Sequence, residues 1–95
     1  MSAVHLVDAT VARQQLRHLA AQGFPAVWIA DRLGMGRSGV IDIRSGQRPM
    51  IRPYTALAIE RLHAHLKDAN PADHGITRQG ASKTQYLATD RGWAS

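Results

Sequence analysis

The sequence predicts an all-α fold, a compact bundle of four to five helices, on the basis of three observations. Apolar residues recur at spacings of three and four in several segments, which places them on one face of a helix. Glycine and proline separate these segments, as they commonly do at helix ends. No segment alternates apolar and polar residues over six or more positions, as a strand with one buried face would.

The first predicted helix begins after Asp8 and Thr10, which can both cap a helix, and it ends at Gly23. Residues at helical spacing form its expected inward face: Val11, Gln15, Leu16, Leu19 and Ala20. This stripe predicts a helix that packs along its length against the rest of the chain.

The second predicted helix covers about 25–33. Pro25 can open it because the first turn of a helix needs no backbone N–H group. Ile29, Ala30 and Leu33 form its inward stripe, and the glycines of 34–36 end it.

The third segment, about 37–45, has an ambivalent composition. Gly39 weakens a helix, and the β-branched side chains of Val40, Ile41 and Ile43 are as common in strands as in helices. We expect a helix because of the context, a tight glycine turn after a short helix.

A fourth helix opens at Pro53 and stops before Asn70-Pro71. Its apolar stripe consists of Ala58, Ile59, Leu62 and Leu66. The segment 47–52 in front of it is expected to be a loop, and no sheet is expected within 8–68.

The C-terminal part is predicted as a polar linker over 70–80 and a short helix over 81–90. Tyr86 and Leu87 are expected to face inward on that helix, ahead of Gly92-Trp93. We interpret this part as a packing or assembly element.

Composition and charge exclude several classes of protein. The apolar run 26–30 is far shorter than the roughly 20 residues that span a bilayer, and no secretion signal is recognised, so a cytoplasmic protein is expected. The absence of cysteine excludes disulfides, iron–sulfur clusters and thiolate zinc sites. Twelve Lys and Arg against seven Asp and Glu give a net charge of +5, which favours a polyanionic partner, either nucleic acid or an acidic membrane surface.

The segments 25–33 and 37–45 together meet the steric demands of a helix-turn-helix. Ala30 is small where the two helices would cross, and Gly34 stands where the chain leaves the first helix and a left-handed backbone is commonly needed. Val40 and Ile43 would then face back onto Ile29 and Leu33.

Residues 29–40, with Gly34-Met35-Gly36 and Ser38-Gly39-Val40 as the densest match, resemble the helix-turn-helix of the lambda-type phage repressors and the wider Cro/repressor family. The close resemblance covers about twenty residues. It implies that the second helix enters the major groove of DNA, that Arg37 and Ser38 touch base edges, and that Gly39 approaches the bases. Arg37 replaces the usual amide, which suggests that guanine is contacted rather than adenine, and Ile41 and Asp42 replace smaller residues.

A looser resemblance is to short regulators of actinobacteria and their phages. In these proteins a glycine and an aromatic residue precede the motif, as Gly23-Phe24 do here, and a later helix often ends in Gly-Trp, as at Gly92-Trp93. Their chains frequently continue with a Pro- and acid-rich segment, which leaves open that this chain is a fragment. The resemblances imply a helix-turn-helix DNA-binding domain over 1–69 and a linker with a short C-terminal helix over 70–95.

The candidate DNA contacts come from the segment 36–52, in which arginines outnumber the single acidic residue Asp42. The base-reading candidates are Arg37, Ser38, Gly39, Ile41 and Asp42, and the phosphate-binding candidates are Arg44, Gln47, Arg48 and Arg52. For Gly39, tight packing against the preceding helix is as good an explanation as a close approach to the bases. Ile41 either contacts a thymine methyl group or is partly covered by neighbouring side chains. For Asp42, pairing with a nearby arginine is favoured over accepting a hydrogen bond from cytosine.

The sequence shows no enzyme and no cofactor site. His63 and His65 diverge by about 200° on a helix, so they cannot chelate one metal ion from the same face. No nucleophile, base and acid are placed as a catalytic set, and no small-molecule ligand is expected.

These observations predict a sequence-specific double-stranded-DNA-binding transcriptional regulator, repressor-like or Cro-like, that binds an operator with its recognition helix in the major groove. It is expected to act at the nucleoid of a bacterium or phage-infected cell, and a homodimer would read two half-sites. Two alternatives stay open: the DNA-binding module of a recombinase or transposase, and an antitoxin-like interaction protein.

Overall fold

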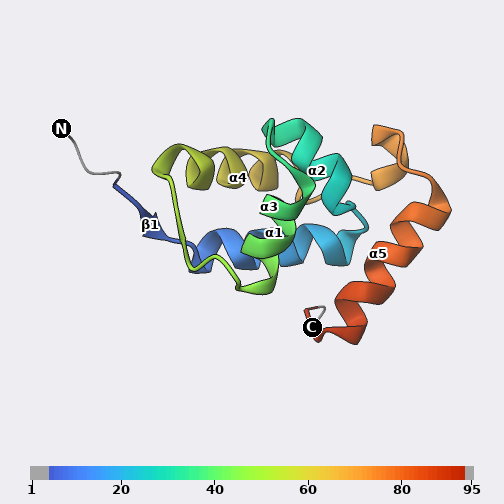
Figure 1. Cartoon of the computed structure of the whole chain (residues 1–95). Helices are drawn as coiled ribbons and strands as arrows, with labels where there is room; N and C mark the ends of the chain where they lie inside the picture. Colours follow the sequence, from blue (N-terminus) through green and yellow to red (C-terminus); the bar gives the residue numbers. More distant parts are fainter. Residues whose placement is uncertain (1–4, 94–95) are drawn as a thin grey trace.

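The structure of the chain is a computed structural model that describes residues 5–93 (Figure 1). Within this range it has five α-helices, one short 3-10 helix and two short strands, which confirms the predicted all-α class. In chain order the elements are β1 (Val7–Asp8), α1 (Thr10–Gln22), α2 (Ala26–Leu33), α3 (Arg37–Ser45), β2 (Met50–Ile51), α4 (Pro53–Leu66), η1 (Pro71–His74) and α5 (Arg78–Asp90). The outermost residues of the two predicted domains, 1–4 and 94–95, lie outside the described residues.

The helix pair predicted at 25–33 and 37–45 is present as α2 and α3. Gly34 caps α2 in the left-handed region with φ 66°, as its place in the sequence predicts. The N–H of Met35 donates to the carbonyl of Ala30 (3.0 Å), which closes the turn. Ala30, Val40 and Ile43 are all buried, as expected of residues between the two helices.

The expectation that 8–68 contains no sheet is wrong. β1 and β2 form an antiparallel pair in which Val7 faces Ile51 and Asp8 faces Met50, so the predicted loop 47–52 is partly a strand. Two-residue strands are too short to produce an alternating pattern, and their pairing depends on bringing together distant segments. The pair ties the start of α1 to the start of α4.

The predicted inward face of α1 is correct at three positions, whereas Gln15 is only half-buried and Val11 is exposed. Leu16, Leu19 and Ala20 are fully buried, but Val11 is 64% exposed and Ala12 takes its place in the core. The buried positions 12, 16, 19 and 20 keep the four- and three-residue spacing of one helical face, from which Val11 is displaced by one position.

The helix α1 is the centre of the bundle, and α3, α4 and α5 all pack against it (Figure 1). Phe24, directly after α1, is fully buried together with Ile59 and Leu66 of α4. This core holds α3 across α1, so that one flank of α3 is buried and the opposite flank is free.

Three expectations for the C-terminal part are corrected. The helix α5 begins at Arg78 rather than 81, because Thr77 Oγ1 accepts a hydrogen bond from the N–H of Gly80 (3.0 Å) and caps it earlier. The linker contains η1. Tyr86 is 74% exposed, and Thr84 and Ala88 are the buried residues of α5, since these smaller side chains fit its close packing on α1.

Candidate nucleic-acid interface

The free flank of α3 carries most of the predicted base-reading residues. Arg37 and Ser38 in its first turn are exposed, and Ile41 and Asp42 are half-buried. Gly36 precedes the helix and no side chain caps it, so the first N–H groups of α3 are open to an external acceptor. A helix end of this kind favours negatively charged groups.

Gly39, in the first turn of α3, lies close to Met35 of the turn between α2 and α3. A Cβ atom added at Gly39 would lie 2.8 Å from Cε of Met35. The contact is with the far end of a flexible side chain, which can move to admit an alanine.

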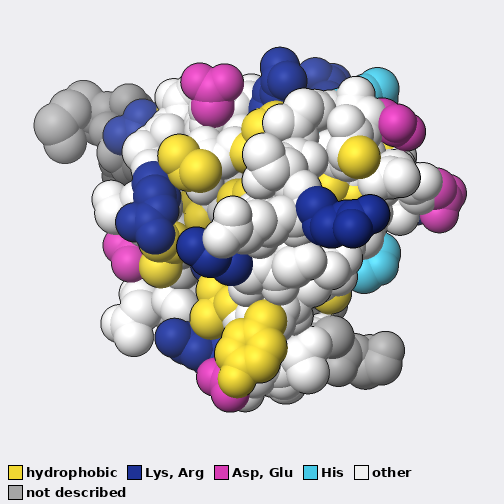
Figure 2. All heavy atoms as spheres, turned by 90° about the vertical axis from the view of Figure 1, so that its right-hand side faces the viewer, with side chains coloured by type: hydrophobic (Ala, Val, Ile, Leu, Met, Phe, Trp, Pro, Cys, Tyr) yellow, Lys and Arg dark blue, Asp and Glu magenta, His cyan; other side chains and the backbone are white. Residues whose placement is uncertain are grey.

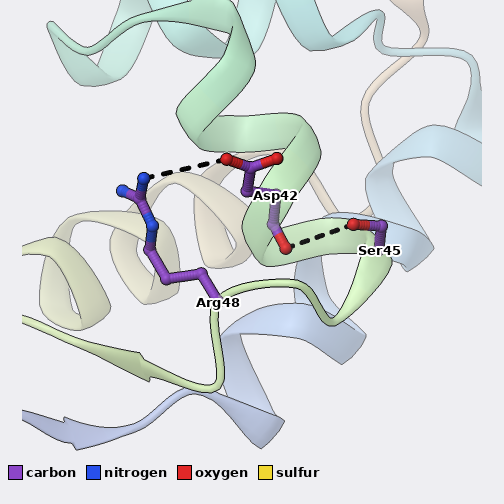
Figure 3. A network of polar contacts seen from close by, with 3 residues as sticks. All are labelled: Asp42, Ser45 and Arg48. Carbon is purple, nitrogen blue, oxygen red and sulfur yellow. Dashed lines mark hydrogen bonds and ion pairs between the residues drawn. The ribbon is translucent and has the colours of Figure 1, made fainter.

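Asp42 and Arg48 form an ion pair across the outer edge of α3, with 3.7 Å between Asp42 Oδ2 and Arg48 Nη2 (Figure 3). The carbonyl oxygen of Asp42 also accepts hydrogen bonds from Ser45 Oγ (3.2 Å) and from the N–H of Arg48 (3.1 Å). Both charged side chains are about half exposed. The favoured interpretation of Asp42, pairing with a nearby arginine, is confirmed, and the pair holds Arg48 beside α3.

Two further candidates, Gln47 and Arg52, are exposed in the segment after α3. Arg48 and Arg52 line an open cavity of about 430 Å³, together with apolar side chains that include Met50 and Tyr54. The structure therefore brings Arg48 and Arg52 together on one side of α3.

Arg44, one of the predicted phosphate contacts, has a buried side chain. Arg44 is only 5% exposed, and its guanidinium lies 5.0 Å from the ring centre of Trp93. Arg17 lies over the same ring at 5.2 Å, and its Nε donates to the carbonyl of Arg44 (2.8 Å). Burial, followed by the charges of Arg37 and Arg91, lowers the pKa of Arg44.

The burial of Arg44 follows from the position of Trp93. The tail folds back onto α1 and α3, where an aromatic ring can cover two guanidinium groups. The sequence shows an aromatic residue at the end of a helix but does not show where that helix docks.

The structure adds one cation to the surroundings of α3 that the sequence analysis missed. Lys83 of α5 is exposed and lines a groove with Arg37 and Arg44. Figure 2, which views the molecule from the side on which α5 lies, shows Lys and Arg side chains spread over this face, with apolar surface between them and Asp and Glu side chains toward its edges. Because α5 is far from α3 in the sequence, only the tertiary packing reveals this neighbour.

Two histidines approach each other between α1 and α4. His18 Nδ1 and His63 Nε2 are 2.8 Å apart, between α1 and α4. Burial, then the nearby His18 and Lys67, lowers the pKa of His63. Among residues 5–93 no group of three or more His, Cys, Asp or Glu side chains is arranged to hold a metal ion.

Comparisons of the chain with models of protein families, with curated proteins and with solved structures found no significant match. No helix of the described part combines the length and apolarity needed to cross a bilayer.

Proposed function

We propose that the protein is a sequence-specific double-stranded-DNA-binding regulator, and that α3 is the helix that enters the major groove. The observation that carries the proposal is the free flank of α3 in the α2–α3 helix pair. That flank begins with Arg37 and Ser38 at an uncapped helix end. The major groove admits a single helix, and residues at the start of such a helix contact the base edges.

The places of the arginines on and beside α3 determine which contact bases and which contact phosphates. Arg37 lies in the first turn of α3, from which a guanidinium can donate to both acceptors of a guanine. Arg48 and Arg52 lie to one side of the helix, where a side chain meets the sugar–phosphate backbone before it meets a base. Gln47, also exposed, joins them as a neutral phosphate contact.

The net charge of +5 supports the same partner. Arginines near α3 supply the sequence-independent attraction that brings a protein to DNA, and base contacts add the preference for one site. Such a protein acts on the genome in the cytoplasm. Two copies bound to half-sites one helical turn apart would double the number of bases read.

The experiment is selection of bound duplexes from a random library at two salt concentrations, followed by affinity measurement on the enriched sequence and a scrambled control. Specific regulators bind their site about 10³ to 10⁷ times more tightly than other DNA. An enriched motif whose bound bases are protected in the major groove supports the proposal. Enrichment of no motif, with equal affinity for both duplexes, contradicts it.

A further inference from the structure

A groove of about 210 Å³ lies beside α3, on the flank away from Arg48. The helix pair forms one wall and α5 forms the other. Its lining consists of Pro25, Ala26, Val27, Arg37, Arg44, Lys83, Thr84 and Leu87. Three of these side chains are cationic, and none of the described lining residues is acidic.

Arg44 lies in this groove with unsatisfied donors. Its Nε and Nη1 atoms are buried and have no hydrogen-bond partner among residues 5–93. Trp93 covers the face of the guanidinium, but the N–H groups of a guanidinium point outward in its plane, where they require an acceptor. A buried donor without an acceptor is costly, and the cost is greater for a charged group.

Arg37 of α3 and Lys83 of α5 are exposed side chains that line the groove, and we take them as its rim. Arg37 and Arg44 are seven residues apart on α3, close to two helical turns, so they share one flank of the helix. No acidic side chain of the described lining balances these three charges. A multivalent anion would balance these charges and would accept hydrogen bonds from the cationic side chains that line the groove.

We propose that this groove binds a phosphate group, with Arg44 at its base and Arg37 and Lys83 at its rim. A phosphate has several oxygens directed to different sides, and it can accept hydrogen bonds from groups on both walls at once. The planar fork of arginine matches phosphate oxygens, and lysine contributes a point charge. The phosphate comes either from the DNA backbone or from a free phosphate-bearing ligand.

The site can be tested with inorganic phosphate alone, so its failure is distinguishable from failure of the proposed DNA binding. Phosphate is titrated into the isotope-labelled full chain at constant ionic strength, and the Nε–Hε resonance of Arg44 is followed by NMR. We expect a saturable shift at millimolar phosphate.

The two lysines of the chain provide a matched pair of variants. Lys83→Gln removes a rim charge and should weaken phosphate binding about fivefold or more, which corresponds to about 1 kcal/mol. Lys67→Gln removes an exposed charge at the end of α4, outside the groove, and should change binding less than about twofold. Both substitutions are at exposed positions, so the comparison holds even where Arg44→Met disturbs the fold.

Duplex DNA then distinguishes the two sources of phosphate. A backbone phosphate as the natural occupant predicts displacement of inorganic phosphate by DNA, and a free ligand predicts simultaneous binding. Either result supports the site. An Arg44 resonance that does not shift, shifts without saturation, or responds equally in the two lysine variants overturns it.

Discussion

Arg48, in the segment after α3, is held against the helix by Asp42, with 3.7 Å between the nearest nitrogen and oxygen. The pair combines an acidic side chain and a cation at the edge of the proposed DNA surface. The carboxylate of Asp42 would repel phosphates and would compete with them for Arg48. In this account, the pair limits non-specific attraction to DNA.

Replacement of Asp42 by Asn tests this role. We expect the variant to bind scrambled duplexes about three to ten times more tightly at low salt, because one repulsive charge is removed and Arg48 is released. Stability should change by less than about 1 kcal/mol, since the pair is half exposed. Fluorescence anisotropy on scrambled DNA measures the effect, and unchanged or weaker binding would show that Asp42 does not oppose DNA.

The turn between α2 and α3 can be tested with two glycines. Gly34 has φ 66° and open space around its Cβ position, so Gly34→Val should destabilise the protein by about 1–3 kcal/mol through backbone strain alone. Gly36 has φ −73°, and an added Cβ would meet only Ser38 Oγ at 3.9 Å, so Gly36→Ala is the matched control. Urea unfolding should show a lower free energy of unfolding for Gly34→Val and no decrease for Gly36→Ala. Equal midpoints would refute the left-handed turn.

The tail should stabilise the bundle through Trp93. Loss of its ring exposes Arg44 and removes two cation–π contacts, so we expect Trp93→Ala to lower the free energy of unfolding by about 1–3 kcal/mol. Tyr86→Ala, at a 74% exposed position of α5, should change it by less than about 0.5 kcal/mol. Thermal unfolding of both variants provides the comparison. A larger loss of stability for Tyr86→Ala than for Trp93→Ala would contradict the packing of Trp93 on Arg44.

Acid should destabilise the protein through His63. Because the pKa of His63 is lowered in the folded state, the unfolded chain binds a proton more readily there. The stability that neutral His63 contributes is therefore present above the ordinary pKa of 6.5 and is lost as the pH falls through 6.5 and below it. Urea unfolding between pH 7.5 and 5 should show this loss, and His63→Gln should reduce it. The exposed His5→Gln is the control, and an equal pH dependence in both variants would contradict the assignment.

The fold was largely predictable because its signals are local. Gly34, Ala30 and Val40 specify the helix pair through backbone conformation and side-chain size at fixed spacing, and the structure places all three as expected. The strands β1 and β2 were missed because their pairing joins segments far apart in the sequence.

The candidate site was predictable only in part, for the same reason. Arg37 and Ser38 are exposed because the first turn of α3 projects from the bundle, which the motif alone indicates. Arg44 is buried because Trp93 folds over it, and that contact depends on where α5 docks. The neighbour Lys83 depends on the same docking.

The central claim is that α3 reads bases through Arg37 while Arg48 holds phosphate, and the most direct measurement is the affinity of Arg37→Ala and Arg48→Ala for the selected and scrambled duplexes over a range of salt. We expect Arg37→Ala to lose about 1–3 kcal/mol of discrimination between the duplexes. Arg48→Ala should lower the affinity for both duplexes alike and reduce the slope of log affinity against log salt by about 0.9. If Arg37→Ala weakens both duplexes equally while Arg48→Ala changes base preference, α3 is not docked as proposed.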